Sequence, residues 1–290
     1  MSAHVTFCSR LVFAAALLAA GAAHAQTLDG RMKKIADTKS ISIAYRTDAS
    51  PFSFVSGGQP DGFSIDICKR VVSSIERQLK VQSLKVNWVP VTVQTRFDTV
   101  ALGKADMECG TSSMTLARMK QVDFSSTIFV ETTGILVKNA SNVRSFSDLG
   151  GKNVAVVEGT TNERAINANV KRWRVDTKVT PFKSRDEAIA AFEVGKVDAV
   201  ASDKLQLLAA ASKMKDKTAM TILPDQLSYE PYAIVVPRND SAMRLAVNTG
   251  LSNLFAGGEI NEIVIRWFAP LGKPSPVLEI VYALGAIPPQ

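Results

Sequence analysis

The chain has 290 residues, a formal net charge of +7, two histidines and three cysteines. This length is enough for one large domain or for two of medium size. After the first 25 residues, no stretch approaches the roughly 18 consecutive apolar residues that a membrane-spanning helix needs, which excludes a membrane span on sequence grounds. The mildly basic charge by itself indicates no particular partner.

The first 25 residues have the pattern of a secretory signal peptide. Arg10 precedes an apolar run, residues 11–20, that is too short to cross a bilayer, and small residues stand three and one positions before Gln26. We therefore expect cleavage after Ala25 and export to the periplasm. The mature chain would have 265 residues (290 − 25) and a net charge of +6 (7 − 1, for Arg10). No cysteine follows the apolar run where a lipid anchor would need one.

Both histidines, His4 and His24, lie in this segment, so the mature chain has none. This excludes serine triads with a histidine base, cysteine–histidine pairs and ordinary zinc sites. Cys8 also leaves with the segment, and Cys68 and Cys109 remain. Two thiols in an oxidising compartment can form a disulfide, or they can be two small buried residues. The residues alone leave both interpretations open.

The first half of the mature chain alternates strand-like and helix-like segments, which favours an α/β fold. Residues 41–45 alternate like a strand. Residues 65–79 place their apolar side chains on one helical face, with Ser64 as the expected N-cap. Residues 86–91 return to strand character, and residues 97–101 predict a helix that ends at Gly103.

The second half repeats this alternation. We expect strands at 153–157 and 179–182, a helix from Thr160 to Trp173 that opens with a T-x-x-E capping box, and a helix at 187–194 that ends at Gly195. Residues 102–111 and 194–203 match each other as helix end, Gly-Lys turn, short strand and polar residue. The sequence therefore predicts two similar α/β lobes with different insertions.

Ligands bind beyond the carboxyl ends of the strands in open α/β sheets. That rule selects four loops, at residues 46–48, 110–113, 159–161 and 202–203. If the two lobes face each other, the four loops line one cleft.

Three arginines occur near these strand ends, namely Arg46, Arg96 and Arg118. A guanidinium group holds a carboxylate through two parallel hydrogen bonds, so the three together favour a carboxylate-binding cleft, although each alone could be a solvated surface residue. Asp203 is suited to an ammonium group or, alternatively, to capping the helix predicted at 204–211. The start of the helix at Thr160 favours an anion, or is only a cap. Positive and negative groups in one cleft fit an amino acid better than a simple acid.

Several segments resemble the glutamate/aspartate-binding proteins of bacterial ABC importers, in the polar amino-acid-binding branch of the periplasmic solute-binding proteins. The resemblance runs from about residue 28 to residue 270. It is carried by residues 90–96 (P-V-T-V-Q-T-R), 108–113 (E-C-G-T-S-S), 123–130 (D-F-S-S-T-I-F-V) and 159–161 (G-T-T). The resemblance implies a soluble protein that captures an acidic amino acid and passes it to the membrane subunits of an importer.

The resemblance also implies a role for each site residue. Arg118 would hold the ligand's α-carboxylate with Thr160 and Thr161, and Asp203 would hold the α-ammonium with the Thr111 carbonyl and the Ser113 hydroxyl. Arg46 and Arg96 would hold the distal carboxylate. The sequence departs from the family pattern at Val93, where the family has a serine, and at Arg185, where some members carry a histidine. A third cation at Arg185 could shift the preference between aspartate and glutamate, or admit another dicarboxylate.

The fold that this predicts is a two-lobed periplasmic-binding-protein fold, each lobe being a mostly parallel sheet flanked by helices. Lobe 1 would comprise residues 26–136 and 239–290, and lobe 2 residues 137–238, with crossing segments near 134–140 and 232–238. Hinge closure of the lobes would trap the ligand. We expect a monomer without metal, cofactor or nucleic acid. Two alternatives are a ligand-sensing module and a dehydratase of a cyclic acid, for which Glu131 and Glu158 are the candidate acids.

Overall fold

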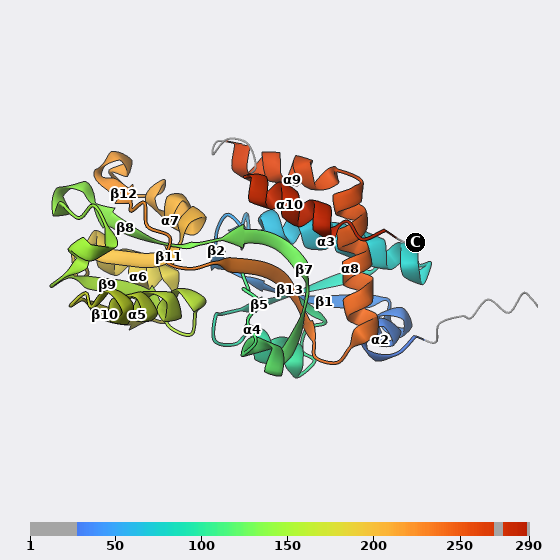
Figure 1. The fold of residues 1–290 in the computed structure, drawn as a ribbon. Helices are drawn as coiled ribbons and strands as arrows, with labels where there is room; N and C mark the ends of the chain where they lie inside the picture. Colours follow the sequence, from blue (N-terminus) through green and yellow to red (C-terminus); the bar gives the residue numbers. More distant parts are fainter. Residues whose placement is uncertain (1–27, 270–274, 289–290) are drawn as a thin grey trace, which may run out of the picture.

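Two α/β lobes joined side by side make up the part of the chain that the computed structural model describes, residues 28–269 and 275–288 (Figure 1). The expected signal peptide and its cleavage site lie outside these residues. Within the described ranges, no helix is long and apolar enough to cross a membrane.

Lobe 1 is built on a five-stranded sheet in the order β5-β1-β6-β13-β7. β5, β1 and β6 are parallel, and β13 runs antiparallel to both of its neighbours, so four of the five strands share one direction. The strands are β1 (Ser40–Arg46), β5 (Lys85–Val91), β6 (Met107–Cys109), β7 (Val122–Glu131) and β13 (Glu230–Pro237).

Helices cover both faces of this sheet, and a three-stranded sheet of β2 (Asp48–Ala49), β3 (Ser53–Ser56) and β4 (Gln59–Asp61) follows β1. α3 packs against α8 and α9, and α10 contacts β7, while α4 contacts β1 and β13. The helices are α2 (Gly30–Thr38), α3 (Phe63–Leu79), α4 (Arg96–Ala101), η1 (Arg118–Lys120), α8 (Ser241–Ala256), α9 (Glu259–Phe268) and α10 (Pro276–Gly285).

Lobe 2 has a five-stranded sheet of similar design, in the order β10-β9-β11-β8-β12. β10, β9 and β11 are parallel, and β8 runs against both of its neighbours. The strands are β8 (Thr133–Lys138), β9 (Asn153–Val157), β10 (Lys178–Phe182), β11 (Ala199–Asp203) and β12 (Met220–Ile222). The helices are α5 (Thr161–Trp173), α6 (Arg185–Glu193), α7 (Lys204–Ala211), η2 (Asn139–Ser141), η3 (Phe146–Leu149) and η4 (Lys217–Ala219).

The chain crosses between the lobes twice, and the strand pairing locates both crossings. β7 ends at Glu131 in the first sheet and β8 begins at Thr133 in the second, so the first crossing is at Thr132. β13 pairs with β7 from Glu230 onward, so the second crossing comes just before Glu230. We propose lobe boundaries at these two points, a few residues earlier than the expected boundaries at 136 and 238. In each sheet the reversed strand is the one that enters from the other lobe.

The repeat read in the sequence corresponds to equivalent strands. Residues 102–111 contain β6 and residues 194–203 contain β11, and each is the third strand of its parallel run. The expected helix start at Ser64 is wrong, because the N-cap of α3 is Gly62, at φ 131°. Glycine adopts this backbone conformation without strain, and a Cβ at this position would clash with the backbone of Phe52. The Ser64 hydroxyl instead donates to the Gly110 carbonyl, at 2.8 Å.

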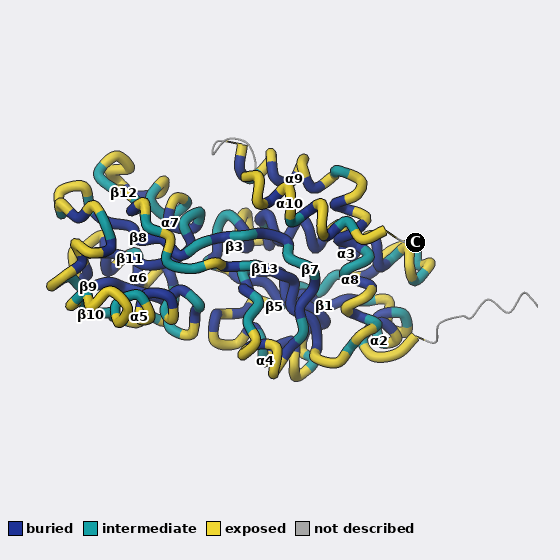
Figure 2. Tube along the Cα trace, in the orientation of Figure 1, coloured by how far each residue is buried: buried dark blue, intermediate teal, exposed yellow. Residues whose placement is uncertain are grey.

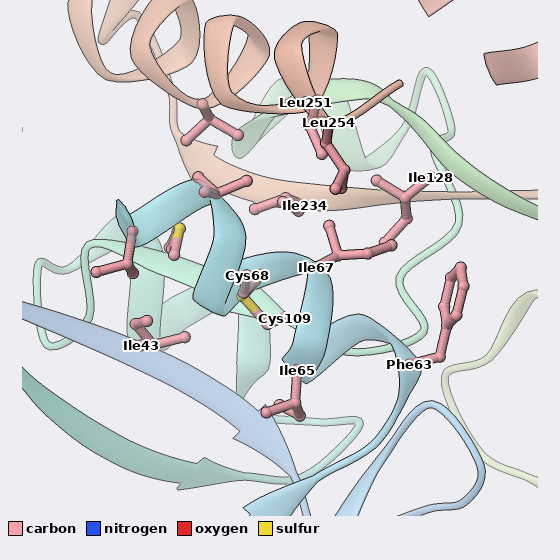
Figure 3. Close-up of a cluster of buried hydrophobic side chains, with 14 of the residues drawn as sticks. Ile43, Phe63, Ile65, Ile67, Cys68, Cys109, Ile128, Ile234, Leu251 and Leu254 are labelled. Carbon is pink, nitrogen blue, oxygen red and sulfur yellow. A yellow bond between two sulfur atoms is a disulfide. The ribbon is translucent and has the colours of Figure 1, made fainter. Parts of the chain in front are cut away.

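The core of lobe 1 lies between its sheet and the layer of α3 and α8. Figure 3 shows α3 directing Ile65 and Ile67 inward, with Leu251 and Leu254 from α8 packing from above. Cys68 and Cys109 form a disulfide in this cluster, which ties α3 to β6. Burial is continuous along the central strands of both lobes, while the outer surfaces of the helices are exposed (Figure 2).

Candidate functional site

The carboxyl ends of the parallel strands of the two lobes face each other, as the strand-end rule predicts. We call the groups gathered there the interlobe site. It contains Arg46 after β1, Arg96 at the start of α4, Thr111, Ser113 and Arg118 after β6, and, from lobe 2, Thr160, Thr161, Arg185 and Asp203. Its four arginines and Asp203 are all buried.

Arg96 and Arg118 are held over the same aromatic ring. The guanidinium carbon of Arg96 lies 4.5 Å and that of Arg118 lies 5.0 Å from the centroid of the Phe97 ring. Arg96 Nη1 donates to the Val93 carbonyl at 2.5 Å, and Arg118 Nη1 donates to the Ser113 carbonyl at 2.8 Å. Burial lowers the pKa of Arg118 to about 10, and burial together with the Arg118 charge lowers the pKa of Arg96. With a pKa of about 10, the Arg118 guanidinium group remains protonated at neutral pH.

Arg46 and Arg185 meet at Asp48, from opposite lobes. Arg46 Nη2 is 2.5 Å from Asp48 Oδ1, and Arg185 Nη1 donates to the Asp48 carbonyl at 2.8 Å, while Arg185 Nε donates to the Ser202 hydroxyl at 3.2 Å. Burial acts to raise the pKa of Asp48, but the charges of Arg46 and Arg185 outweigh it and lower the pKa. A pocket of about 220 Å³ adjoins this contact, with Asp48, Arg185 and Gln206 in its lining.

Glu108 lies beneath the arginines on β6 and is fully buried. Its Oε1 occupies the space that a side chain at Gly110 would need. Burial raises the pKa of the Glu108 carboxyl, although Arg96, the Ser112 hydroxyl and Arg46 act in the opposite direction. Within the described residues, neither carboxylate oxygen has a donor with the geometry of a hydrogen bond.

Asp203 ends β11 and stands at the N-cap position of α7, but its side chain makes no capping hydrogen bond. Its carboxylate accepts instead from Asn162 Nδ2 at 3.0 Å and from Gln206 Nε2 at 2.6 Å. Burial raises the pKa of Asp203, and the Arg185 charge opposes this shift. Each oxygen of the carboxylate thus has one side-chain donor, and the two donors fix its orientation at the end of β11.

Ser113, which follows β6, and Glu230, which begins β13, form a polar contact on the lobe 1 side of the site. The Ser113 hydroxyl donates to Glu230 Oε2 at 2.5 Å, and the Ser228 hydroxyl donates to Glu230 Oε1 at 2.7 Å. With its proton committed to Glu230, the Ser113 oxygen can only accept from a further partner. Its distance to the Thr161 hydroxyl oxygen across the lobes is 3.4 Å.

The amino end of α5 lies at the lobe 2 side of the site. The Thr160 hydroxyl accepts from the Glu163 N–H at 3.1 Å and donates to the Val157 carbonyl at 2.6 Å, so it acts as the helix cap. The Glu163 carboxylate accepts from the Gly159 N–H at 2.8 Å, one residue earlier than in the expected capping box. Val93 of lobe 1 packs towards Gly159, with 3.7 Å between Val93 Cγ1 and the position of a Cβ at Gly159.

The two acids considered for catalysis are engaged elsewhere. Glu131, at the first crossing, accepts from the Thr132 N–H at 2.7 Å and from the Leu205 N–H at 2.8 Å. Glu158 forms an ion pair with Lys183 at 2.8 Å, and both side chains are largely exposed. No group of three or more potential ligands within residues 28–269 and 275–288 could hold a metal ion.

The structure thus places the predicted site residues at the facing strand ends of the two lobes, which are joined there by Arg185 and Asp48 and by Ser113 and Thr161. Thr111 is half-buried, and no role beyond its position follows from its contacts among the described residues. Sequence reasoning missed Phe97, Glu108 and Glu230. Glu108 could have been noticed in the sequence, because it is a charged residue between two apolar ones, Met107 and Cys109, at the end of a strand.

Comparison with known proteins agrees with this geometry. Residues 41–270 match the family described as bacterial extracellular solute-binding proteins, family 3. The L-glutamate/L-aspartate-binding protein of Pseudomonas aeruginosa is 34% identical over 256 residues, which cover 88% of this chain and 84% of that protein. The ABC transporter glutamine-binding protein of Bacillus subtilis is 29% identical over 266 residues, covering 88% and 93%.

A solved structure of an ancestral amino acid-binding protein, a precursor of cyclohexadienyl dehydratase, superposes with a TM-score of 0.71. It is 27% identical and covers 82% of this chain and 100% of that one. The match of fold extends over both lobes, and the family match covers more than half of the sequence. The chain therefore belongs to family 3 of the bacterial extracellular solute-binding proteins.

Proposed function

We propose that this solute-binding protein captures an acidic amino acid, glutamate or aspartate, between its lobes for delivery to the membrane subunits of an ABC importer. The observation that carries the proposal is the set of three buried arginines on lobe 1, Arg46, Arg96 and Arg118, which face lobe 2, where Arg185 and Asp203 are also buried. Buried guanidinium groups need anionic partners, and removing such a partner costs several kcal/mol. An amino acid with two carboxylates and one ammonium supplies the complementary charges.

The α-ammonium end of the ligand fits Asp203. The Ser113 hydroxyl, which donates its hydrogen bond to Glu230, adds an acceptor oxygen, and the Thr111 carbonyl is close by in the chain. The α-carboxylate fits Arg118, which lies near the amino end of α5, where the backbone N–H groups of Thr160 and Thr161 and the helix dipole favour an anion.

The distal carboxylate fits Arg46 and Arg96, with Arg185 approaching from lobe 2. Buried polar groups support this, since the Nε atoms of Arg46 and Arg96 have no partner among the described residues. Val93 faces Gly159 and offers the ligand no hydrogen bond. The similarity to a glutamate/aspartate-binding protein of another bacterium supports the same ligand class.

Several further properties belong to the proposal. Lobes that touch through Arg185 and Asp48 would open and close about Thr132 and the segment before Glu230. We propose a periplasmic monomer, cleaved after Ala25, that performs no chemistry on its ligand. The arrangement of the two candidate acids supports the last point, because Glu131 accepts two backbone N–H groups and Glu158 pairs with Lys183.

Titration calorimetry with glutamate and glutamine tests the ligand class. Wild type should bind glutamine at least about tenfold more weakly, a difference of about 1.4 kcal/mol, because the neutral amide turns an NH₂ group towards arginine donors. Arg96→Met should narrow this gap. Arg164→Met removes an exposed guanidinium near Arg118 and is the matched control, which should leave the gap unchanged. Equal affinity of wild type for the two ligands would leave only the broader amino-acid-binding assignment.

A further inference from the structure

Glu108 is a buried carboxyl group that the proposed ligand contacts do not use. The charged groups that face it are Arg46 from β1, Arg96 from α4 and Arg118 from η1. On β13 the residue opposite Glu108 is Val235, which is apolar. Glu108 is therefore close enough to the two arginines proposed for the distal carboxylate for their charges to act on it, and its Oε1 and the Arg46 Cγ both lie close to the position of a Cβ at Gly110.

Glu108 differs from the other buried carboxyl groups around the site in its hydrogen bonds. Each of the others accepts from at least one donor: Asp203 from Asn162 and Gln206, Glu230 from Ser113 and Ser228, and Glu131 from two backbone N–H groups. In the described part of the chain, neither Glu108 oxygen has a hydrogen bond of good geometry, although the nearby Ser112 hydroxyl stabilises its charge. Poor hydrogen bonding makes the ionised form of a buried carboxyl group costly, and protonation removes that cost.

A ligand carboxylate at Arg46 and Arg96 changes the balance of charge around Glu108. The two guanidinium groups that favour its ionised form would then be shared with a second anion. That anion would also repel Glu108 directly, since like charges a few ångströms apart in a buried site favour protonation of one of them. Binding of the distal carboxylate adds no positive charge near Glu108. The protonated form of Glu108 therefore becomes more stable relative to the ionised form.

We propose that Glu108 takes up a proton from solvent when an acidic amino acid binds, so that the protein captures the distal carboxylate together with a proton. One O–H bond forms on the Glu108 carboxylate, and the protonated group can then donate to the Ser112 hydroxyl or to the ligand. This inference rests on the proposed function, because it needs a distal carboxylate at Arg46 and Arg96. A neutral side chain such as that of glutamine would bind without this proton.

Calorimetry in two buffers of different protonation enthalpy measures the number of protons taken up per ligand. With wild type at about pH 6 to 7, glutamate should take up more protons than glutamine, the difference approaching one. Relative to glutamine, the Kd for glutamate should rise with pH by up to about tenfold per pH unit. Glu108→Gln should abolish the difference in protons, while Asp106→Asn, which removes a buried carboxyl that already has donors in Lys34 and the Ser42 N–H, should retain it.

The outcomes separate the inference from the proposed function. Tighter binding of glutamate than of glutamine without extra proton uptake would overturn the inference and leave the proposed function standing. A proton difference that persists in Glu108→Gln would assign the proton to another group and would also overturn it. If the Glu108→Gln protein fails to fold, the comparison of proton uptake between glutamate and glutamine in wild type still tests the inference. Infrared difference spectra of wild type should then show a new protonated carboxyl with glutamate only.

Discussion

Phe97 is the residue whose replacement tests most directly how the site is preorganised. Its ring lies under two guanidinium carbons, at 4.5 Å and 5.0 Å from the centroid. Phe97→Leu keeps an apolar side chain of similar size but removes the π face, so Arg96 and Arg118 lose a shared support. Each then has to be immobilised when the ligand binds instead of being held beforehand.

The size of the effect follows from these two contacts. Immobilising a flexible side chain on binding costs about 0.5–1.5 kcal/mol, so two arginines give about 1–3 kcal/mol, or roughly a 5- to 150-fold weaker Kd for glutamate. Arg118 is proposed to bind the α-carboxylate, which all amino acids have, and Arg96 is proposed to bind the distal carboxylate, which glutamine lacks. Glutamine should therefore lose less affinity than glutamate.

Titration calorimetry of Phe97→Leu with both ligands measures this, and Phe124→Leu is the matched control. Phe124 belongs to the same small cluster and lies 6.5 Å from Phe97 between ring centroids, but the ring that supports the two arginines is that of Phe97. The control should lose stability without a comparable loss of affinity. If Phe97→Leu binds glutamate as tightly as wild type, the arginines are held by their carbonyl contacts alone and the reasoning fails.

Two further predictions concern stability. Replacing Cys68 and Cys109 with alanine opens a loop with a sequence separation of 41. Urea titrations should show a free energy of unfolding lower by up to about 4 kcal/mol. In strong reductant, the wild type and the double variant should no longer differ in this free energy. Burial, with the Asp203 charge, raises the pKa of Glu131 from 4.5 to about 8, so the folded state binds more protons than the unfolded state between these values. The stability of the ligand-free protein should accordingly fall as pH rises towards about 8, and Glu131→Gln should flatten that dependence; an unchanged pH profile in the variant would assign it to another group.

The loops that carry the candidate site residues could be predicted from the sequence because one geometric rule applies to them. Carboxyl ends of parallel strands must meet at one edge of a sheet, so Arg46 and Asp203 could be placed from strand assignments alone. The partners of these residues were not predictable in the same way. Ser113 and Glu230, for example, are 117 residues apart in the chain and meet only because β13 enters the first sheet.

Errors in detail have equally local causes. The N-cap of α3 was misplaced because Ser64 is a good capping residue, whereas the close approach of the Phe52 backbone demands a glycine at position 62. The lobe boundaries that we propose lie before those expected from the sequence, because they follow the pairing partners of β7, β8 and β13, which the sequence does not show. Periodicity reports that a strand exists, and contacts between distant segments decide which sheet it joins.

The position of β13 between β6 and β7 has a consequence for the order in which the protein can be assembled. Lobe 2 is one continuous stretch from β8 to β12 and can complete its sheet as soon as that stretch is available. In lobe 1, β7 pairs only with β13 in the described sheet, and β13 arrives about a hundred residues later. A chain that leaves a ribosome or a translocation channel from its amino end must therefore hold an unfinished lobe 1, with β6 and β7 still open, until the later lobe has already emerged.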